Sequence, residues 1–136
     1  MIYEKSCGAV VYTRAFGEAR FLIETMRKGH ISLCKGHVEP EDDGELGTAS
    51  REIREETGLA VRFADGFRET IRYSPYEGCE KDVVFFLAEA ESVELTPQEA
   101  EVSVLRWLPL AEALDALTYP DDRRVLRAAA QALGVA

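Results

Sequence analysis

The sequence predicts an α/β or α+β fold, in which a β-sheet is layered with helices. Three observations favour this class: short apolar runs bounded by turn residues, a charged central segment with helical spacing, and apolar residues at helical spacing near the C-terminus. The 136 residues match the length of one domain, so we expect a single domain over 1–136.

The first two expected strands form a hairpin. Residues 6–13 and 21–26 are apolar runs typical of strands, and segment 14–20 between them contains Gly17 among turn-forming residues. The two strands should therefore lie side by side in the sheet.

A central helix is expected to end at Gly58. This glycine lies where a helix is closed by a residue in the left-handed conformation, and Leu59 is the apolar residue that packs against such a cap. Leu46, Ala49 and Ile53 recur at helical spacing and are expected to form the buried stripe.

Three further strands are expected in the second half of the chain. One spans 59 to about 73, a loop follows at 74–78, and 81–89 is rich in Val and Phe, as a mostly buried strand would be. Residues 103–107 form another short strand.

Two helices are expected to complete the fold. Pro109 suits the first turn of a helix that continues to about Leu117. The last helix begins near Pro120, where Asp121 and Asp122 complement the positive end of the helix dipole. The expected buried stripe of this last helix is Val125, Leu126, Ala129 and Leu133.

Charge and hydropathy exclude several classes of function. A net charge of −9 argues against a stable complex with nucleic acid, because such binding needs a basic surface. The longest apolar run, 83–88, is too short to span a bilayer, and residues 1–10 lack the pattern of a signal peptide. We expect a cytoplasmic protein without membrane association. Cys7, Cys34 and Cys79 lack paired metal-type spacing and are expected to be free thiols.

Three carboxylates are concentrated on the central helix. Glu52, Glu55 and Glu56 are related by i,i+3 and i,i+4 spacing, so they lie on one side of the helix. Like charges at these spacings repel, and Arg51 and Arg54 offset only part of the repulsion. Hard divalent cations such as Mg²⁺ or Mn²⁺ would offset it better, because they bind carboxylate oxygens. A solvated acidic face is the alternative interpretation.

The segment 51–59 reads Arg-Glu-Ile-Arg-Glu-Glu-Thr-Gly-Leu, and Gly36 precedes it. This pattern resembles the Nudix box, the signature of hydrolases that cleave nucleoside diphosphates linked to another moiety. The resemblance implies an αβα sandwich with a mixed β-sheet. The family has a Glu in the loop before the helix. This chain has one extra residue there, and either Asp42 or Asp43 takes the place of that Glu.

The resemblance implies roles for the residues that match the box. The implied catalytic residues are Arg51, Glu52, Glu55 and Glu56. The three glutamates would bind Mg²⁺ or Mn²⁺, with the Lys35 carbonyl and Glu101 as further ligands. Glu52 or a downstream Glu would be the general base. Glu101 is equally suited to be an exposed loop residue beside Glu99.

Residues 35–40, 66–73 and 81–89 are similar to diadenosine tetraphosphate hydrolases. That similarity extends over roughly residues 5–126. It implies substrate contacts from six residues: His30, Lys35, Gly36, Tyr73, Lys81 and Tyr119. His30 and Lys81 would contact the polyphosphate, and Tyr73 and Tyr119 would stack on an adenine. The alternatives are an edge-strand lysine, a surface histidine and amphipathic core tyrosines. Members of that subfamily carry Trp and Pro before the Lys-Gly pair, where this chain has 31–34, Ile-Ser-Leu-Cys.

The expected function is metal-dependent hydrolysis of a pyrophosphate bond, with diadenosine tetraphosphate cut to ATP and AMP. Nucleoside triphosphates, nucleotide sugars and capped RNA are alternative substrates. A non-catalytic regulatory nucleotide-binding domain is the alternative of a different class. The expected partner is a small-molecule nucleotide, and the expected state is a monomer or a homodimer.

Overall fold

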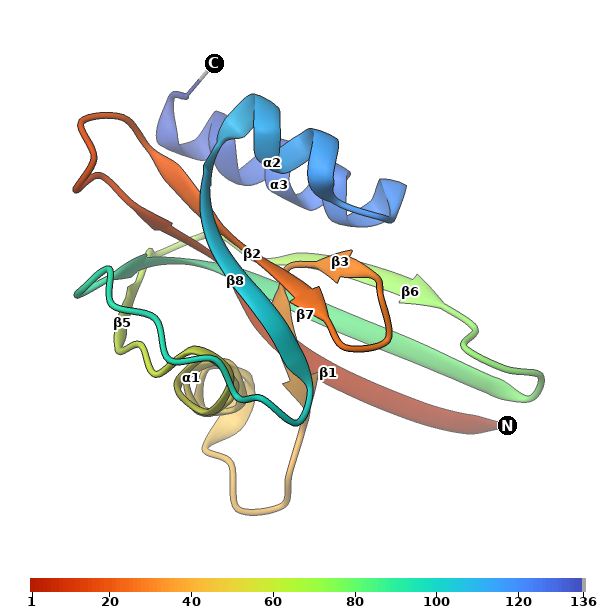
Figure 1. Cartoon of the computed structure of the whole chain (residues 1–136). Coiled ribbons are helices and arrows are strands. Elements are labelled where there is room, and N and C mark those ends of the chain that lie inside the picture. Colours follow the sequence, from red (N-terminus) through yellow and green to blue (C-terminus); the bar gives the residue numbers. More distant parts are fainter. Residues whose placement is uncertain (136) are drawn as a thin grey trace.

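A computed structural model describes residues 1–135 and confirms the mixed α and β class. Within these residues, one eight-stranded sheet is covered by three helices (Figure 1). The strands are β1 (Ile2–Thr13), β2 (Arg20–Met26), β3 (Ile31–Ser32), β4 (Cys34–His37), β5 (Val61–Phe63), β6 (Glu69–Tyr73), β7 (Cys79–Ala90) and β8 (Val102–Pro109). The helices are α1 (Gly44–Thr57), α2 (Leu110–Ala116) and α3 (Pro120–Leu133).

Strand β1 organises the sheet. It runs parallel to β7 along nearly its whole length, from Ile2 opposite Cys79 to Tyr12 opposite Glu89. On its other side it pairs antiparallel with β2 and β4. Strands β5 and β6 both pair antiparallel with β7, and β8 pairs antiparallel with β2. The sheet is therefore mixed, as expected.

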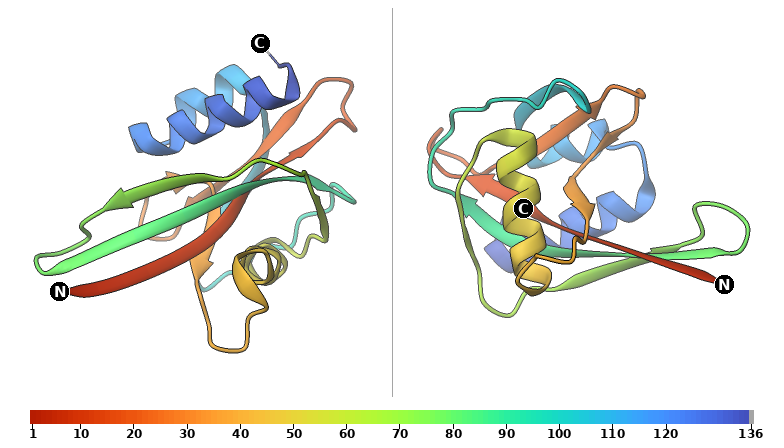
Figure 2. Two further views of the ribbon diagram at one scale, coloured as in Figure 1. Left: turned by 180° about the vertical axis from the view of Figure 1, so that it is seen from behind. Right: turned by 90° about the horizontal axis from the view of Figure 1, so that it is seen from below.

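The helices cover opposite faces of the sheet, with α1 on one face and α2 and α3 on the other (Figures 1 and 2). Alternation along β1 divides its side chains between two cores. Cys7 and Ala9 pack in the core beneath α1, and Val10 packs in the core with α2 and α3. Both faces of the central strands are thus buried, and the result is the expected αβα sandwich.

The first half of the chain contains more β-strand than the sequence pattern indicated. The expected hairpin is present, but its first strand begins at Ile2, because its N-terminal end pairs with β7 rather than with β2. The short strands β3 and β4 were not predicted. Their residues show no alternation of their own, and only pairing with β2 and β1 defines them.

The single strand expected over 59–73 is wrong. Residues 61–63 and 69–73 are separate strands, and the turn between them contains Gly66 with a φ of 83°. A positive φ is readily adopted by glycine and rarely by other residues. Both strands pair with β7 at different points along its length.

The cap of α1 is as predicted, but its buried face is not. Gly58 has a φ of 79°, and its N–H donates to the Arg54 carbonyl at 2.8 Å. Leu46, expected in the buried stripe, is 47 % exposed, whereas Glu56, expected on the opposite side, is buried with Ala49 and Ile53. The helix is rotated so that its carboxylate-bearing side turns partly toward the sheet.

The C-terminal helices match their predicted positions. Val125, Leu126 and Ala129 are buried, while Leu133 is only partly buried at the margin of the core. Among residues 1–135, none of the helices is long and apolar enough to cross a membrane. All three cysteines lie in this range and are free, as expected.

Candidate active site

The candidate site lies where β4 meets α1. Strand β1 approaches β4 so closely at Gly8 that a Cβ there would collide with the Cys34 carbonyl and with Lys35. This approach holds β4 against the sheet and points the following loop toward α1. A cavity of about 520 Å³ opens there, lined by β4, α1, the turn after β2 and the loop before β8.

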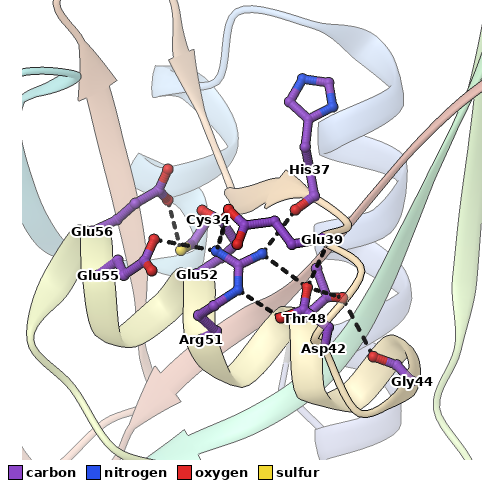
Figure 3. A network of polar contacts seen from close by, with 10 residues as sticks. All are labelled: Cys34, His37, Glu39, Asp42, Gly44, Thr48, Arg51, Glu52, Glu55 and Glu56. Carbon is purple, nitrogen blue, oxygen red and sulfur yellow. Dashed lines mark hydrogen bonds and ion pairs between the residues drawn. The ribbon is translucent and has the colours of Figure 1, made fainter.

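Arg51 is the centre of a polar network that joins α1 to the loop between β4 and α1 (Figure 3). Its Nη1 donates to Glu52 Oε1 at 2.9 Å and to Glu55 Oε2 at 3.2 Å. Its Nη2 donates to the His37 carbonyl at 2.8 Å, which ties the loop after β4 to the helix. Arg51 therefore fixes two of the three predicted metal ligands but does not line the cavity itself.

Asp42, rather than Asp43, is the loop carboxylate that pairs with Arg51. Its Oδ1 accepts from Nε at 2.7 Å and its Oδ2 from Nη2 at 2.9 Å, which is a bidentate pair. Its Oδ2 also accepts from the Glu39 N–H at 2.9 Å and from Thr48 Oγ1 at 2.7 Å. Hydrogen bonds from Arg51 hold the pKa of Asp42 well below its usual range. The extra loop residue is accommodated without loss of this pair.

Gly36 and Glu52 are in direct apposition. A Cβ on Gly36 would collide with the carboxyl group of Glu52, so only glycine lets the helix carboxylate lie against the backbone of β4. Burial raises the pKa of Glu52, and the hydrogen bond from Arg51 opposes this rise. Glu52 is therefore a carboxylate with increased proton affinity beside a cavity, which suits a general base.

Glu56 differs from its neighbour Glu55 in burial. It is 3 % exposed, and burial raises its pKa to about 7. The thiol of Cys34 donates to Glu56 Oε1 at 3.0 Å. The Glu55 side chain, in contrast, is about half exposed and turns toward Arg51. Both line the cavity.

The structure brings most of the predicted site residues to this one cavity. The residues that line it include His30, Lys35, Gly36, Glu52, Glu55, Glu56, Lys81 and Glu101. Lys81 is only 8 % exposed, and burial followed by repulsion from Lys35 lowers its pKa. This burial argues against the alternative of an edge-strand lysine placed for solubility.

A second cavity, of about 790 Å³, adjoins the first and contains the predicted tyrosines. Tyr73 lies at the end of β6 and Tyr119 just before α3, and both side chains remain exposed. The rings of His30 and Tyr119 are 6.2 Å apart and tilted by 46°. His30, Lys35 and Lys81 line both cavities, so the basic residues lie between the carboxylates and the tyrosines.

Sequence reasoning missed three residues of these cavities and their surroundings. Lys28 lines both cavities from the turn after β2. Asp122 lines the second cavity, where burial raises its pKa to about 6. Glu24 is buried behind Glu56. The one sequence signal was a glutamate inside the otherwise apolar run of β2, since Lys28 and Asp122 have ordinary positions in a turn and at a helix start.

The loop before β8 is attached to the end of α1. The Thr96 N–H donates to the Thr57 carbonyl at 2.8 Å, and the Gln98 N–H donates to the Glu56 carbonyl at 3.1 Å. These are carbonyls that the last turn of a helix leaves without partners. On the other side, the Arg27 N–H donates to the Glu101 carbonyl at 2.9 Å. Glu101 is thereby held at the cavity, although its side chain is exposed.

The side chains at the first cavity fit a hard divalent cation. Three carboxylates from one helix line it, and the raised pKa values of Glu52 and Glu56 arise chiefly from burial of negative charge. Oxygen ligands of this kind are those that Mg²⁺ and Mn²⁺ prefer. The lysines that line the same cavity suit the phosphates that complete the coordination of Mg²⁺.

A model of the NUDIX domain matches residues 4–129. The chain belongs to the NUDIX domain family. An asymmetrical bis(5'-nucleosyl)-tetraphosphatase of Sus scrofa is 30 % identical over 135 residues, covering 90 % of this chain and 90 % of that protein. An 8-oxo-(d)GTP phosphatase of Mycolicibacterium smegmatis is 36 % identical over 106 residues, which are 78 % of this chain and 32 % of that protein.

A solved structure is also similar along its whole length. The crystal structure of a C. elegans Ap4A hydrolase in a binary complex matches with a TM-score of 0.86 and 26 % identity, covering 96 % of this chain and 98 % of that one. The Nudix fold and the membership predicted from segment 51–59 are confirmed. The chain is a Nudix pyrophosphohydrolase, as the sequence predicted.

Proposed function

We propose that this Nudix enzyme hydrolyses dinucleoside polyphosphates asymmetrically, cutting diadenosine tetraphosphate to ATP and AMP. The observation that carries the proposal is the adjacency of the two cavities. One contains the glutamates of α1, the other contains Tyr73 and Tyr119, and both share the basic residues Lys35 and Lys81. A nucleoside attached to a long polyphosphate has the same order of chemical groups.

The basic residues between the cavities would bind the phosphates. Lys28, Lys35 and Lys81 would neutralise the polyphosphate, and His30 would contact it from the side of Tyr119. Stacking of a base on Tyr73 or Tyr119 contributes about 1–3 kcal/mol. This local basic cluster would attract an anionic substrate despite the net charge of −9.

The chemical step would be attack of a water oxygen on one phosphorus. The new P–O bond forms as a phosphoanhydride P–O bond breaks, and the leaving phosphate keeps the electron pair. We assign Glu52 as the group that takes the proton of the water, because Arg51 Nη1 occupies only its Oε1. Arg51 orients this carboxylate, and Gly36 lets it lie against β4.

Glu52, Glu55 and Glu56 would hold Mg²⁺ or Mn²⁺, with Glu101 and the Lys35 carbonyl as further ligands. A divalent cation bound there would neutralise phosphate charge and lower the pKa of the attacking water. Removal of divalent cations with a chelator should abolish turnover, and Mg²⁺ or Mn²⁺ should restore it.

The direct test is incubation of the enzyme with diadenosine tetraphosphate and Mg²⁺, with separation of the products by chromatography. Wild type should release ATP and AMP in equal amounts, and Glu52→Gln should release neither at a comparable rate. Two molecules of ADP would mean symmetrical cleavage and contradict the proposal. Tyr73→Ala and Tyr119→Ala should raise KM more than they lower kcat.

Hydrolysis of a nucleoside triphosphate is the second candidate. The similarity to the 8-oxo-(d)GTP phosphatase supports it, although the chain spans about a third of that protein. Parallel measurement of kcat/KM for diadenosine tetraphosphate, ATP and 8-oxo-dGTP separates the two. A higher value for either triphosphate would favour this second function.

A further inference from the structure

A buried cluster of three side chains lies behind the first cavity. Glu24 of β2, Cys34 of β4 and Glu56 of α1 each offer one ligand atom, and these atoms lie within 4.8 Å of one another. Among the residues that the structure describes, this is the single group of three metal-type ligands so close together. Figure 3 shows Cys34 and Glu56 pointing toward each other.

Glu24 contacts the other two members of the cluster but keeps one carboxyl oxygen unpaired. It is 1 % exposed, and its Oε1 makes no hydrogen bond with any described residue. It shares the α1 side of β2 with Leu22, which packs in the core beneath that helix. Leaving a carboxylate oxygen unpaired in such a place is costly, so a bound group is the simplest reason for its retention.

We propose that Glu24, Cys34 and Glu56 form a second, buried cation site that selects zinc or a similar borderline or soft divalent ion. One thiolate and two carboxylates would balance such a cation better than a neutral ligand set. The thiolate disfavours Mg²⁺, which prefers oxygen ligands, and favours Zn²⁺. This selectivity distinguishes the site from the hydrolytic one.

The geometry allows a zinc ion to enter and bind. Zinc bonds are about 2.3 Å to sulfur and about 2.0–2.2 Å to carboxylate oxygen, so small side-chain rotations bring the three atoms into range. Glu56 also lines the first cavity, which gives the ion a path from solvent and leaves a fourth position on that side. The thiol proton of Cys34, and any proton that the two carboxylates share, would be released to solvent on binding.

A zinc ion bound here would take Glu56 from the hydrolytic site. If the proposed function holds, Zn²⁺ should therefore inhibit hydrolysis supported by Mg²⁺. The binding itself does not depend on that function, because it can be measured without a nucleotide.

The test uses Cd²⁺, whose bond to a thiolate gives an ultraviolet charge-transfer band. Titration of the protein with Cd²⁺ in excess Mg²⁺ should give one saturable band, and Zn²⁺ should displace it. The band should vanish in Cys34→Ser and persist in the matched variants Cys7→Ser and Cys79→Ser, which alter the other two buried thiols.

Glu24→Gln is the second variant and keeps the thiol intact. It should weaken Cd²⁺ and Zn²⁺ affinity about tenfold or more, while circular dichroism confirms that the protein is folded. The proposal fails if wild type gives no thiolate band, if the band persists in Cys34→Ser, or if Glu24→Gln binds both ions as tightly as wild type. If wild type binds Cd²⁺ as expected but does not hydrolyse diadenosine tetraphosphate in Mg²⁺, the proposed function is contradicted and the cation site is not.

Discussion

The loop carboxylate Asp42, just before α1, and Glu56, in the last turn of that helix, have opposite environments. Asp42 is satisfied by Arg51, Thr48 and a backbone N–H, and its pKa is held low. Glu56 meets a thiol and a second carboxylate, and its pKa is raised to about 7. The paired group fixes the shape of the loop. The group without a basic partner keeps the capacity to bind a cation.

This difference separates carboxylates that fix the local structure from carboxylates that are suited to bind a cation. Fully paired carboxylates are stable as they stand, so their loss should reduce stability. Buried carboxylates without a basic partner are costly in the folded protein, so their loss should reduce activity and spare stability. The following substitutions test that division.

The largest expected effect is on turnover in Glu56→Gln. Loss of a buried cation ligand should lower kcat roughly a thousandfold, equivalent to about 4 kcal/mol of transition-state stabilisation. The melting temperature should stay the same or rise, because an uncompensated buried carboxyl group is removed. Glu55→Gln, on the exposed neighbour, is the control and should retain more activity. Equal rates in wild type and Glu56→Gln would remove Glu56 from the mechanism.

Asp122 extends the comparison to the second cavity. Burial raises its pKa to about 6, above the usual 3.8 of an unfolded chain. The folded state therefore binds the proton more tightly, and its contribution to stability is full below about pH 4 and lost as the pH rises to about 6. Asp122→Asn should gain about 2–3 kcal/mol over wild type between those limits.

Urea unfolding of wild type and Asp122→Asn on both sides of this pH range measures the change. The exposed neighbour offers the control, since Asp121→Asn should follow wild type at every pH. A constant difference between wild type and Asp122→Asn across the range would mean that Asp122 has an ordinary pKa.

Gly36→Ala tests whether Glu52 depends on its close approach to the backbone of β4. Its Cβ would displace Glu52, and misplacement of a catalytic group costs about ten- to a hundredfold in kcat. Gly47→Ala is a matched change inside α1, where the new Cβ meets the Asp43 Cβ at 3.3 Å. It should keep full activity and gain at most about 1 kcal/mol in unfolding free energy. Equal kcat values in the two variants would contradict the apposition of Gly36 and Glu52.

The smallest effect is expected for Asp42→Asn, because asparagine keeps one acceptor oxygen for Arg51. The depressed pKa of Asp42 means that its contribution is present at neutral pH and is lost as the pH falls below about 4. The variant should have a lower melting temperature than wild type at neutral pH, and its melting temperature should fall less than that of wild type on acidification. Asp43→Asn, which changes the adjacent carboxylate, should behave as wild type in both respects.

Local patterns in the sequence predicted what depends on neighbours along the chain. The cap at Gly58 and the spacing of Glu52, Glu55 and Glu56 follow from helix geometry alone. The buried side of α1 does not, because the sheet decides how the helix is rotated. Periodicity therefore placed Leu46 inside and Glu56 outside, both incorrectly.

The sequence also left open whether Asp42 or Asp43 pairs with Arg51, because that pairing depends on the fold and not on spacing along the chain. Asp42 keeps the spacing of the family Glu from Gly36, and Asp43 keeps its spacing to Arg51. Only the path of the loop in space brings Asp42 to Arg51. Glu24 was overlooked for a similar reason. The apolar run around it predicted the strand, but only the packing of α1 against β2 shows that this glutamate is buried beside Cys34 and Glu56.

The bonds between the loop before β8 and the last turn of α1 have an evolutionary consequence. Gln98 is anchored to the Glu56 carbonyl, and Glu101 is anchored to Arg27. Only residues 99 and 100 lie between these anchors, so they can change while Glu101 stays at the cavity mouth and the helix keeps its register. Related sequences can therefore differ at residues 99 and 100 while Glu101 and the carboxylates of α1 keep their positions.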